Sequence, residues 1–192
     1  MDREEYIFGI DVGGTKIAAG LVKQDGEIIL SKKIAADTFR PQGILYQLQE
    51  LIPEIISKKE TAPAGIGIGV PGAVDWKTGT ALRASNLPYK SLPLAAELES
   101  QFELPVYLEN DADAAALGEK WFGKGQGYQR FIYLTIGTGI GAGIIAGGEL
   151  IRGCEVGHTI VKPGGPLCGC GTRGCWEAVA AGPGIAALMK EK

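Results

Sequence analysis

The chain has 192 residues, of which 45% are hydrophobic, and its 19 basic and 22 acidic side chains give a net charge of −3. This composition predicts a globular chain with enough apolar residues to fill one large domain or two small ones. The balanced charges form no basic stripe, which argues against nucleic acid as a partner. The sequence contains no apolar run of about 18 residues that would predict a membrane span, and its acidic N-terminus does not resemble a signal peptide. We therefore expect a cytoplasmic protein.

The N-terminal part of the sequence predicts three strands followed by a helix. Strands are predicted at 6–12, 16–22 and 28–36, with a Gly-Gly-Thr turn after the first and the hairpin signal "KQDGE" after the second. Residues 41–59 carry apolar side chains at helical spacing, and Pro53 predicts a kink or break in that helix.

The alternation of strands and helices continues along the chain. We expect the following elements: a buried strand at 64–70, a short helix at 93–102, a strand at 104–110 and an alanine-rich helix at 111–123. Such alternation predicts an α/β sheet. The glycine-rich loop at 123–127 suggests a boundary between an N-terminal α/β domain, 1–122, and the start of a C-terminal α/β domain, 123–192.

The strand–turn–strand pattern of the N-terminus returns after this loop. A shift of 123 positions superposes five identical residues, which place Gly14, Thr15, Ile17, Ala19 and Gly20 on Gly137, Thr138, Ile140, Ala142 and Gly143. A duplicated domain would put two Gly-Thr turns face to face across a cleft. Exposed backbone amides in glycine turns bind phosphate, so the pair suits a nucleoside triphosphate.

The first turn, "DVGGTK", lacks the spacing of a Walker A loop and joins two strands. In one interpretation Asp11 binds a hydrated Mg²⁺ while Gly13, Gly14 and Thr15 bind phosphate. In the other, the segment is a glycine-rich hairpin whose aspartate caps the turn. The second turn favours phosphate binding.

The segment "HTIVKPGGPLCGCGTRGCWE" holds the only histidine and three of the four cysteines. Cys168, Cys170 and Cys175 follow the spacing C-x-C-x₄-C, and His158 completes a Cys₃His set that suits tetrahedral Zn²⁺. Four protein ligands leave no open position, so the site would be structural. The alternative is a group of buried cysteines or a redox pair. Cys154 lies outside the spacing and is expected to be a small buried side chain.

Six motifs together resemble the ROK family of sugar kinases and sugar-responsive repressors. They are "GIDVGGTK", "GIGIGVPG", "LENDADAAALGE", "LTIGTGIGAG", "EVGH" and "CGCGTRGCWE". The resemblance implies an actin/hexokinase-like (ribonuclease H-like) fold, with duplicated α/β domains around a cleft that holds ATP and sugar. It also implies a homo-oligomer, a dimer, in the full-length form. In the family the adenosine-binding segment and the final helix follow the point where this chain stops, so we expect the adenine pocket to be incomplete.

The resemblance assigns site residues by position. Asp111 becomes the catalytic base, and the sugar is bound by Gly72, Asn86, Asn110, Asp111, Glu155, His158 and Glu177. Mg²⁺ and phosphate are bound by Asp11, Gly13, Gly14, Thr15, Lys16, Gly137, Thr138 and Gly139. Without the family, Asp111 also reads as a plain helix N-cap, and Gly72 and Asn86 as turn residues.

The expected function is ATP-dependent phosphorylation of a hexose at its 6-hydroxyl, with glucose as the first candidate substrate. The expected cofactors are ATP, Mg²⁺ and Zn²⁺. The zinc would order the loop that carries Glu177 and would let His158 orient a sugar hydroxyl with its second ring nitrogen. It would not touch phosphate. The competing reading is a sugar-sensing module of a ROK regulator, or a fragment that binds sugar without turnover. A structural zinc domain without a ligand would leave the two Gly-Thr turns unexplained.

Overall fold

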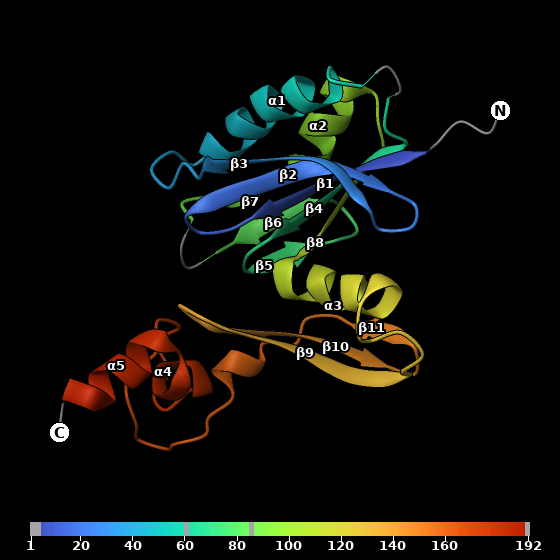
Figure 1. The fold of residues 1–192 in the computed structure, drawn as a ribbon. Helices are drawn as coiled ribbons and strands as arrows, with labels where there is room; N and C mark the ends of the chain where they lie inside the picture. Colours follow the sequence, from blue (N-terminus) through green and yellow to red (C-terminus); the bar gives the residue numbers. More distant parts are fainter. Residues whose placement is uncertain (1–4, 60–61, 85–86, 191–192) are drawn as a thin grey trace. The chain divides into compact units, whose positions relative to one another are not determined.

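The computed structural model describes residues 5–59, 62–84 and 87–190. They belong to two compact units, Met1–Asp111 and Ala112–Lys192 (Figure 1). This division falls at the start of the helix predicted at 111–123, whereas the sequence placed the domain boundary at its end. The assignment of domains to 1–122 and 123–192 stays a prediction. None of the helices in the described ranges has both the length and the hydropathy needed to cross a membrane.

The first unit is built on a five-stranded mixed sheet with the order β3-β2-β1-β4-β8. Its strands are β1 (Tyr6–Val12), β2 (Lys16–Lys23), β3 (Ile28–Ala35), β4 (Gly65–Val70) and β8 (Val106–Asn110). The first three strands form an antiparallel meander, and β4 and β8 continue the sheet in parallel with β1. The predicted strands of this unit are therefore confirmed.

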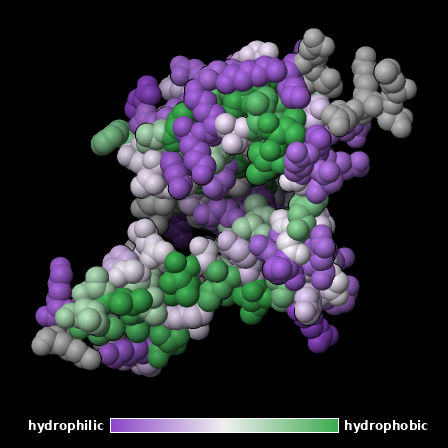
Figure 2. Space-filling model, in the orientation of Figure 1, coloured by the Kyte–Doolittle hydropathy of each residue, from purple (hydrophilic) through white to green (hydrophobic). Residues whose placement is uncertain are grey.

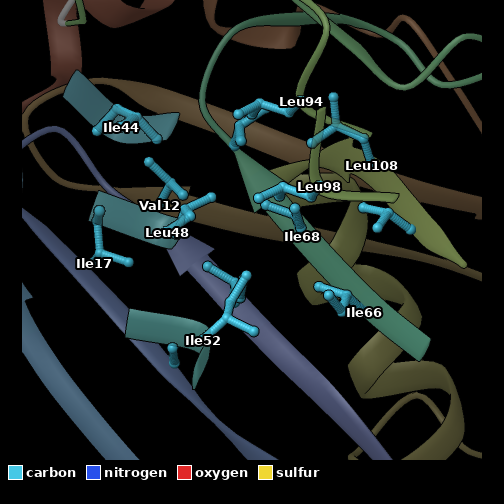
Figure 3. Close-up of a cluster of buried hydrophobic side chains, with 14 of the residues drawn as sticks. Val12, Ile17, Ile44, Leu48, Ile52, Ile66, Ile68, Leu94, Leu98 and Leu108 are labelled. Atoms are coloured by element: carbon cyan, nitrogen blue, oxygen red, sulfur yellow. The ribbon is translucent and has the colours of Figure 1, made fainter. Parts of the chain in front are cut away.

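The core of the first unit lies on one face of this sheet. Phe8, Ile10 and Val12 alternate along β1 and are 0%, 5% and 0% exposed, as expected for a strand with one buried face. They pack with apolar side chains of α1 (Gly43–Ile56) and α2 (Leu94–Phe102). Figure 3 shows the meeting of these layers, in which Leu48 of α1 lies close to Val12 and Leu98 of α2 lies close to Ile68.

The sequence predicted a kink or a break at Pro53. The break is wrong, because α1 runs through Pro53 and ends at Ile56, and the kink stays a prediction. Proline removes one intrahelical hydrogen bond. Ile52 and Ile55, on either side of it, are 0% and 2% exposed. Tertiary packing of the apolar face supplies most of the stability of such a helix, so it continues past the proline.

A second, three-stranded sheet of the first unit was not anticipated from the sequence. It has the order β5-β6-β7, with β5 (Ala73–Asp75), β6 (Thr80–Arg83) and β7 (Lys90–Leu92). Tyr89, directly before β7, is 1% exposed and belongs to the core of the unit.

The second unit contains a three-stranded antiparallel sheet with the order β11-β10-β9. Its elements are α3 (Asp111–Phe122), β9 (Arg130–Ile136), β10 (Ile140–Ala146), β11 (Glu149–Ile151), the 3-10 helix η1 (Val156–His158), α4 (Trp176–Ala180) and α5 (Gly182–Lys190). The helix α3 packs closely on one face of the sheet, where a Cβ on Gly143 would collide with Ala116.

Both units contain the repeated hairpin that the sequence predicted, with a one-residue difference in the turn. In the first hairpin Val12 pairs with Ile17, which leaves residues 13–16 between them. In the second, Ile136 pairs with Ile140, which leaves residues 137–139. The shift of 123 therefore relates β2 to β10, whereas β1 corresponds to β9 with a shift of 124.

The two hairpins differ in how their equivalent apolar faces are covered. By the strand pairing, the buried Phe8, Ile10 and Val12 correspond to Ile132, Leu134 and Ile136 of β9, which are 63%, 40% and 55% exposed. Exposed apolar side chains also occur on α5, at Ile185, Leu188 and Met189, and Figure 2 shows apolar colouring over this C-terminal helix. The described part of the second unit thus leaves apolar surface accessible on β9 and α5.

Candidate functional site

In the first unit, the ends of two parallel strands bring predicted sugar-binding residues together. Val70 of β4 pairs with Asn110 of β8, so the Pro71-Gly72 turn that follows β4 lies beside the start of α3 at Asp111. The carboxyl ends of parallel strands are the usual place for ligand-binding groups in open α/β sheets.

Hydrogen bonds fasten this turn to its surroundings on two sides. The Asn110 side-chain amide donates to the Gly72 carbonyl over 3.0 Å, and the Tyr89 hydroxyl donates to the Pro71 carbonyl over 2.6 Å. Gly72 has φ of 79°, and a Cβ there would overlap the carbonyl oxygen of Arg83. Only glycine fits this position without strain.

Tyr89 also lies close enough to Asp111 to respond to its charge. Burial, and to a smaller extent the negative charge of Asp111, raise the pKa of the Tyr89 phenol well above its usual value. Sequence reasoning missed this residue because nothing in "NLPYK" marks a tyrosine as part of a polar site. Asn86, in the same segment, lies outside the described residues.

The first Gly-Thr turn presents polar groups at the end of β1. Asp11 pairs with Ala18 on one side and with Gly69 on the other, and its side chain is exposed. The Gly13 amide donates to the Lys16 carbonyl over 2.8 Å and closes the turn. Thr15 and Lys16 are also exposed. The carboxylate and the turn are therefore accessible from solvent.

The second Gly-Thr turn is held by residues of the C-terminal helices. The Gly137 amide donates to the Gly139 carbonyl over 2.9 Å, and the Gly182 amide donates to the Gly137 carbonyl over 2.8 Å. At the other end of the turn, the Ile140 amide donates to the Glu177 carboxylate over 3.0 Å. Glu177, which the resemblance assigned to the sugar, thus also contacts the turn.

The structure brings together the four residues that the spacing predicted as metal ligands. One ligand atom each of His158, Cys168, Cys170 and Cys175 lies within 4.8 Å of all the others. The loop that carries the cysteines is closed by a 2.8 Å bond from the Cys168 amide to the Thr172 carbonyl. Cys154 is a free, partly buried cysteine outside this group.

The spacing of these atoms fits a tetrahedral metal site. With Zn–S bonds of about 2.3 Å, two thiolates of a tetrahedron stand roughly 3.8 Å apart. The sulfur atoms of Cys170 and Cys175 are 3.7 Å apart, and the Cys168 sulfur is 3.6 Å from Nδ1 of His158. The donor set and its dimensions therefore fit Zn²⁺.

The three thiols of the cluster differ in acidity. Hydrogen bonds from the backbone amide and the side chain of Thr172 lower the pKa of Cys170 to about 7, whereas burial raises the pKa of Cys175 to about 12. Burial likewise raises the pKa of Cys168. A metal ion binds the deprotonated thiols, so its binding would release protons.

Glu155 precedes the same cluster. It is exposed, and its carbonyl accepts a 3.0 Å hydrogen bond from the His158 amide across η1. The short helix η1 packs against α4, which carries Glu177. Glu155, His158 and Glu177 therefore belong to one region of the second unit, whereas Asp11, Gly72, Asn110 and Asp111 belong to the first.

The model of the ROK family matches residues 7–192. The chain belongs to the ROK family. Among its ROK relatives is the glucokinase of Thermotoga maritima, which is 43% identical over 194 residues, with 96% of this chain and 60% of the glucokinase covered. The xylose repressor of Caldicellulosiruptor bescii is 39% identical over 197 residues, with 96% and 49% covered.

Solved ROK structures share the fold. A glucokinase from Streptomyces griseus, in complex with glucose and AMPPNP, superposes with a TM-score of 0.85 and 41% identity over 97% of this chain and 60% of that chain. The mixed α/β architecture is thus the actin/hexokinase-like fold of ROK kinases, as the motifs predicted. The chain spans about 60% of the length of the glucokinases that it matches.

Proposed function

We propose that this ROK chain takes part in ATP-dependent phosphorylation of a hexose, with glucose as the first candidate and its 6-hydroxyl as the acceptor. The observation that carries the proposal is the placement of Asn110 at the end of β8, bonded to the Gly72 carbonyl, with Asp111 next to it at the start of α3. A carboxylate beside an amide suits a sugar hydroxyl that must be oriented and deprotonated. The similarity to a glucokinase that binds glucose and AMPPNP supports the same reading.

In the proposed reaction Asp111 accepts the proton of the 6-hydroxyl while that oxygen forms a bond to the γ-phosphorus and the bond to the β-phosphate oxygen breaks. Asn110, Gly72 and Asn86 from the first unit, with Glu155, His158 and Glu177 from the second, bind the sugar hydroxyls. Phosphoryl transfer depends mainly on such positioning and on neutralisation of charge.

The phosphates are assigned to the two Gly-Thr turns. Gly13, Gly14, Thr15 and Lys16 form one site, and Gly137, Thr138 and Gly139 form the other. Asp11, exposed at the end of β1, would hold a hydrated Mg²⁺, which offsets phosphate charge when bound. The cluster of His158, Cys168, Cys170 and Cys175 would hold a structural Zn²⁺ that orders its loop.

The setting of the reaction is also part of the proposal. We place the protein in the cytoplasm, as a homo-oligomer, a dimer, in its full-length form, with neither nucleic acid nor membrane involved. The second candidate function is sugar sensing without turnover, which the similarity to a xylose repressor favours.

A panel of hexoses separates these two functions. Each sugar is titrated against the chain by calorimetry, and ADP release is followed in a coupled assay with MgATP. A kinase releases ADP with glucose and loses that activity in Asp111→Asn. It keeps the activity in Asp113→Asn, which changes the second aspartate at the start of α3. Sugar binding with no ADP release at any sugar or ATP concentration would favour the sensing module. Absence of sugar binding would overturn both.

A further inference from the structure

One carboxylate touches both the metal-ligand cluster and the second Gly-Thr turn. One oxygen of Glu177 accepts a 3.0 Å hydrogen bond from the Ile140 amide, and the other lies 3.7 Å from the Cys168 sulfur. Ile140 is the first residue of β10 and directly follows the turn at Gly139. Glu177 therefore bridges two sites that the sequence treated as separate.

The fit of this carboxylate against the turn is tight. A Cβ on Gly139 would overlap the Glu177 carboxylate, so the side chain fills the space beside the turn. The opposite end of the turn is held from the same region, because the Gly182 amide donates to the Gly137 carbonyl over 2.8 Å. The position of the turn thus depends on where α4 and the start of α5 lie.

The helix α4 is too short to hold its own position. It has five residues, and isolated helices of that length are not stable in water. Its N-terminus is fixed by Cys175, a completely buried member of the cluster, and by a 2.8 Å bond from the Trp176 amide to the Thr159 carbonyl. The cluster therefore anchors the helix that carries Glu177.

We propose that Glu177 is a positioning residue through which occupation of the cysteine–histidine cluster by its metal fixes the second Gly-Thr turn. The coupling runs from Cys175 through α4 to the Glu177 carboxylate and from there to the Ile140 amide. It rests on the proposed metal and phosphate sites and adds a dependence of phosphate binding on the metal. The metal does not contact phosphate; it determines the shape of the turn.

Hydrogen exchange at the Ile140 amide tests the coupling without any nucleotide. The chain is loaded with Zn²⁺, its metal content is measured by elemental analysis, and a second sample is stripped with a chelator. We expect exchange at Ile140 to be roughly tenfold faster or more in the stripped sample, which is the scale of a lost hydrogen bond to a charged acceptor. Unchanged exchange, or a chain that binds no zinc, would overturn the proposal.

Variants identify the route of the coupling. Glu177→Ala should speed exchange at Ile140 even with zinc bound, and removing zinc from it should add little. Glu177→Gln keeps an acceptor oxygen and should restore part of the protection. Glu149→Ala, an exposed glutamate of β11, is the matched control and should behave as wild type. An equal effect of zinc removal in wild type and Glu177→Ala would show that the coupling bypasses Glu177.

A binding measurement separates this proposal from the assignment of the phosphate site. Inorganic triphosphate with Mg²⁺ is titrated against the loaded and stripped chains. Weaker binding to the stripped chain, together with faster exchange at Ile140, supports both. Faster exchange with unchanged triphosphate affinity supports the coupling and contradicts the phosphate role of residues 137–139.

Discussion

Removal of the Tyr89 hydroxyl is expected to destabilise the first unit. In Tyr89→Phe the ring keeps its packing, but the buried Pro71 carbonyl loses the hydrogen bond that it accepts over 2.6 Å. Tyr89 is 1% exposed, so water has no direct access to the vacated position. A buried acceptor left without a donor costs about 1 to 3 kcal/mol. For a chain of this size each kcal/mol lowers Tm by roughly 2 to 4 °C, and the total shift is about 2 to 12 °C.

The assay is urea unfolding followed by circular dichroism, with Tyr46→Phe as the control. The Tyr46 hydroxyl donates to the Gln42 side chain over the same 2.6 Å, but Tyr46 is 44% exposed. Water replaces that bond, so the control should stay within about 0.5 kcal/mol of wild type. Equal stability of Tyr89→Phe and wild type, or an equal loss in both variants, would refute the reasoning.

The same pair has a predicted pH dependence. Burial and the charge of Asp111 raise the pKa of Tyr89 in the folded chain, whereas an unfolded tyrosine titrates near about 10. A group with a raised pKa contributes stability that is complete below its unfolded pKa and is lost as pH rises toward the folded one. The advantage of wild type over Tyr89→Phe should therefore shrink above about pH 10. A constant difference between about pH 8 and 11 would contradict this assignment.

Three further predictions concern the other sites. Asp111→Asn should lower turnover by about 10² to 10⁴-fold and leave glucose affinity nearly unchanged, as measured by ADP release and calorimetry, since only the proton acceptor is lost. Cys170→Ser should lose bound zinc and Cys154→Ser should keep it in elemental analysis, and equal loss in both would contradict the ligand set. Ile132→Thr should change the free energy of unfolding by less than about 0.5 kcal/mol in urea titrations, because the side chain is 63% exposed and threonine keeps the β-branch; a larger loss would mean that β9 is covered in solution.

The long strands were predictable because their apolar residues alternate or form short buried runs with glycine turns at their ends. The meander of β1, β2 and β3 and the parallel β4 and β8 all follow this pattern. The strands β5, β6 and β7 have only three or four residues, too few to show a period. The helix α1 continues through Pro53 because tertiary packing of its apolar face outweighs the tendency of proline to end a helix. The proline is visible in the sequence, whereas the packing is not.

The metal-ligand cluster was also predictable from a local pattern. Its three cysteines lie within eight residues, so the chain between them is short enough to keep their sulfur atoms close together. The contacts that organise the other sites join distant parts of the chain. Asn110 and Gly72 are 38 positions apart, and Glu177 and Ile140 are 37 apart. No local pattern marks such pairs, so only the folded chain shows that Tyr89 contacts the Pro71-Gly72 turn and that Glu177 contacts the second Gly-Thr turn.

The contacts of Glu177 change how its variants must be interpreted. A carboxylate has two oxygens with about four acceptor positions, so the bond from the Ile140 amide leaves capacity for a sugar hydroxyl, and the two roles are compatible. A loss of sugar binding in Glu177→Ala then has two possible causes, a missing ligand or a displaced turn. Exchange at the Ile140 amide distinguishes them, because Glu177→Ala would leave that amide protected if Glu177 acted only as a sugar ligand. Asn110 offers the cleaner test of the sugar site, since its side-chain amide donates to the Gly72 carbonyl within one unit.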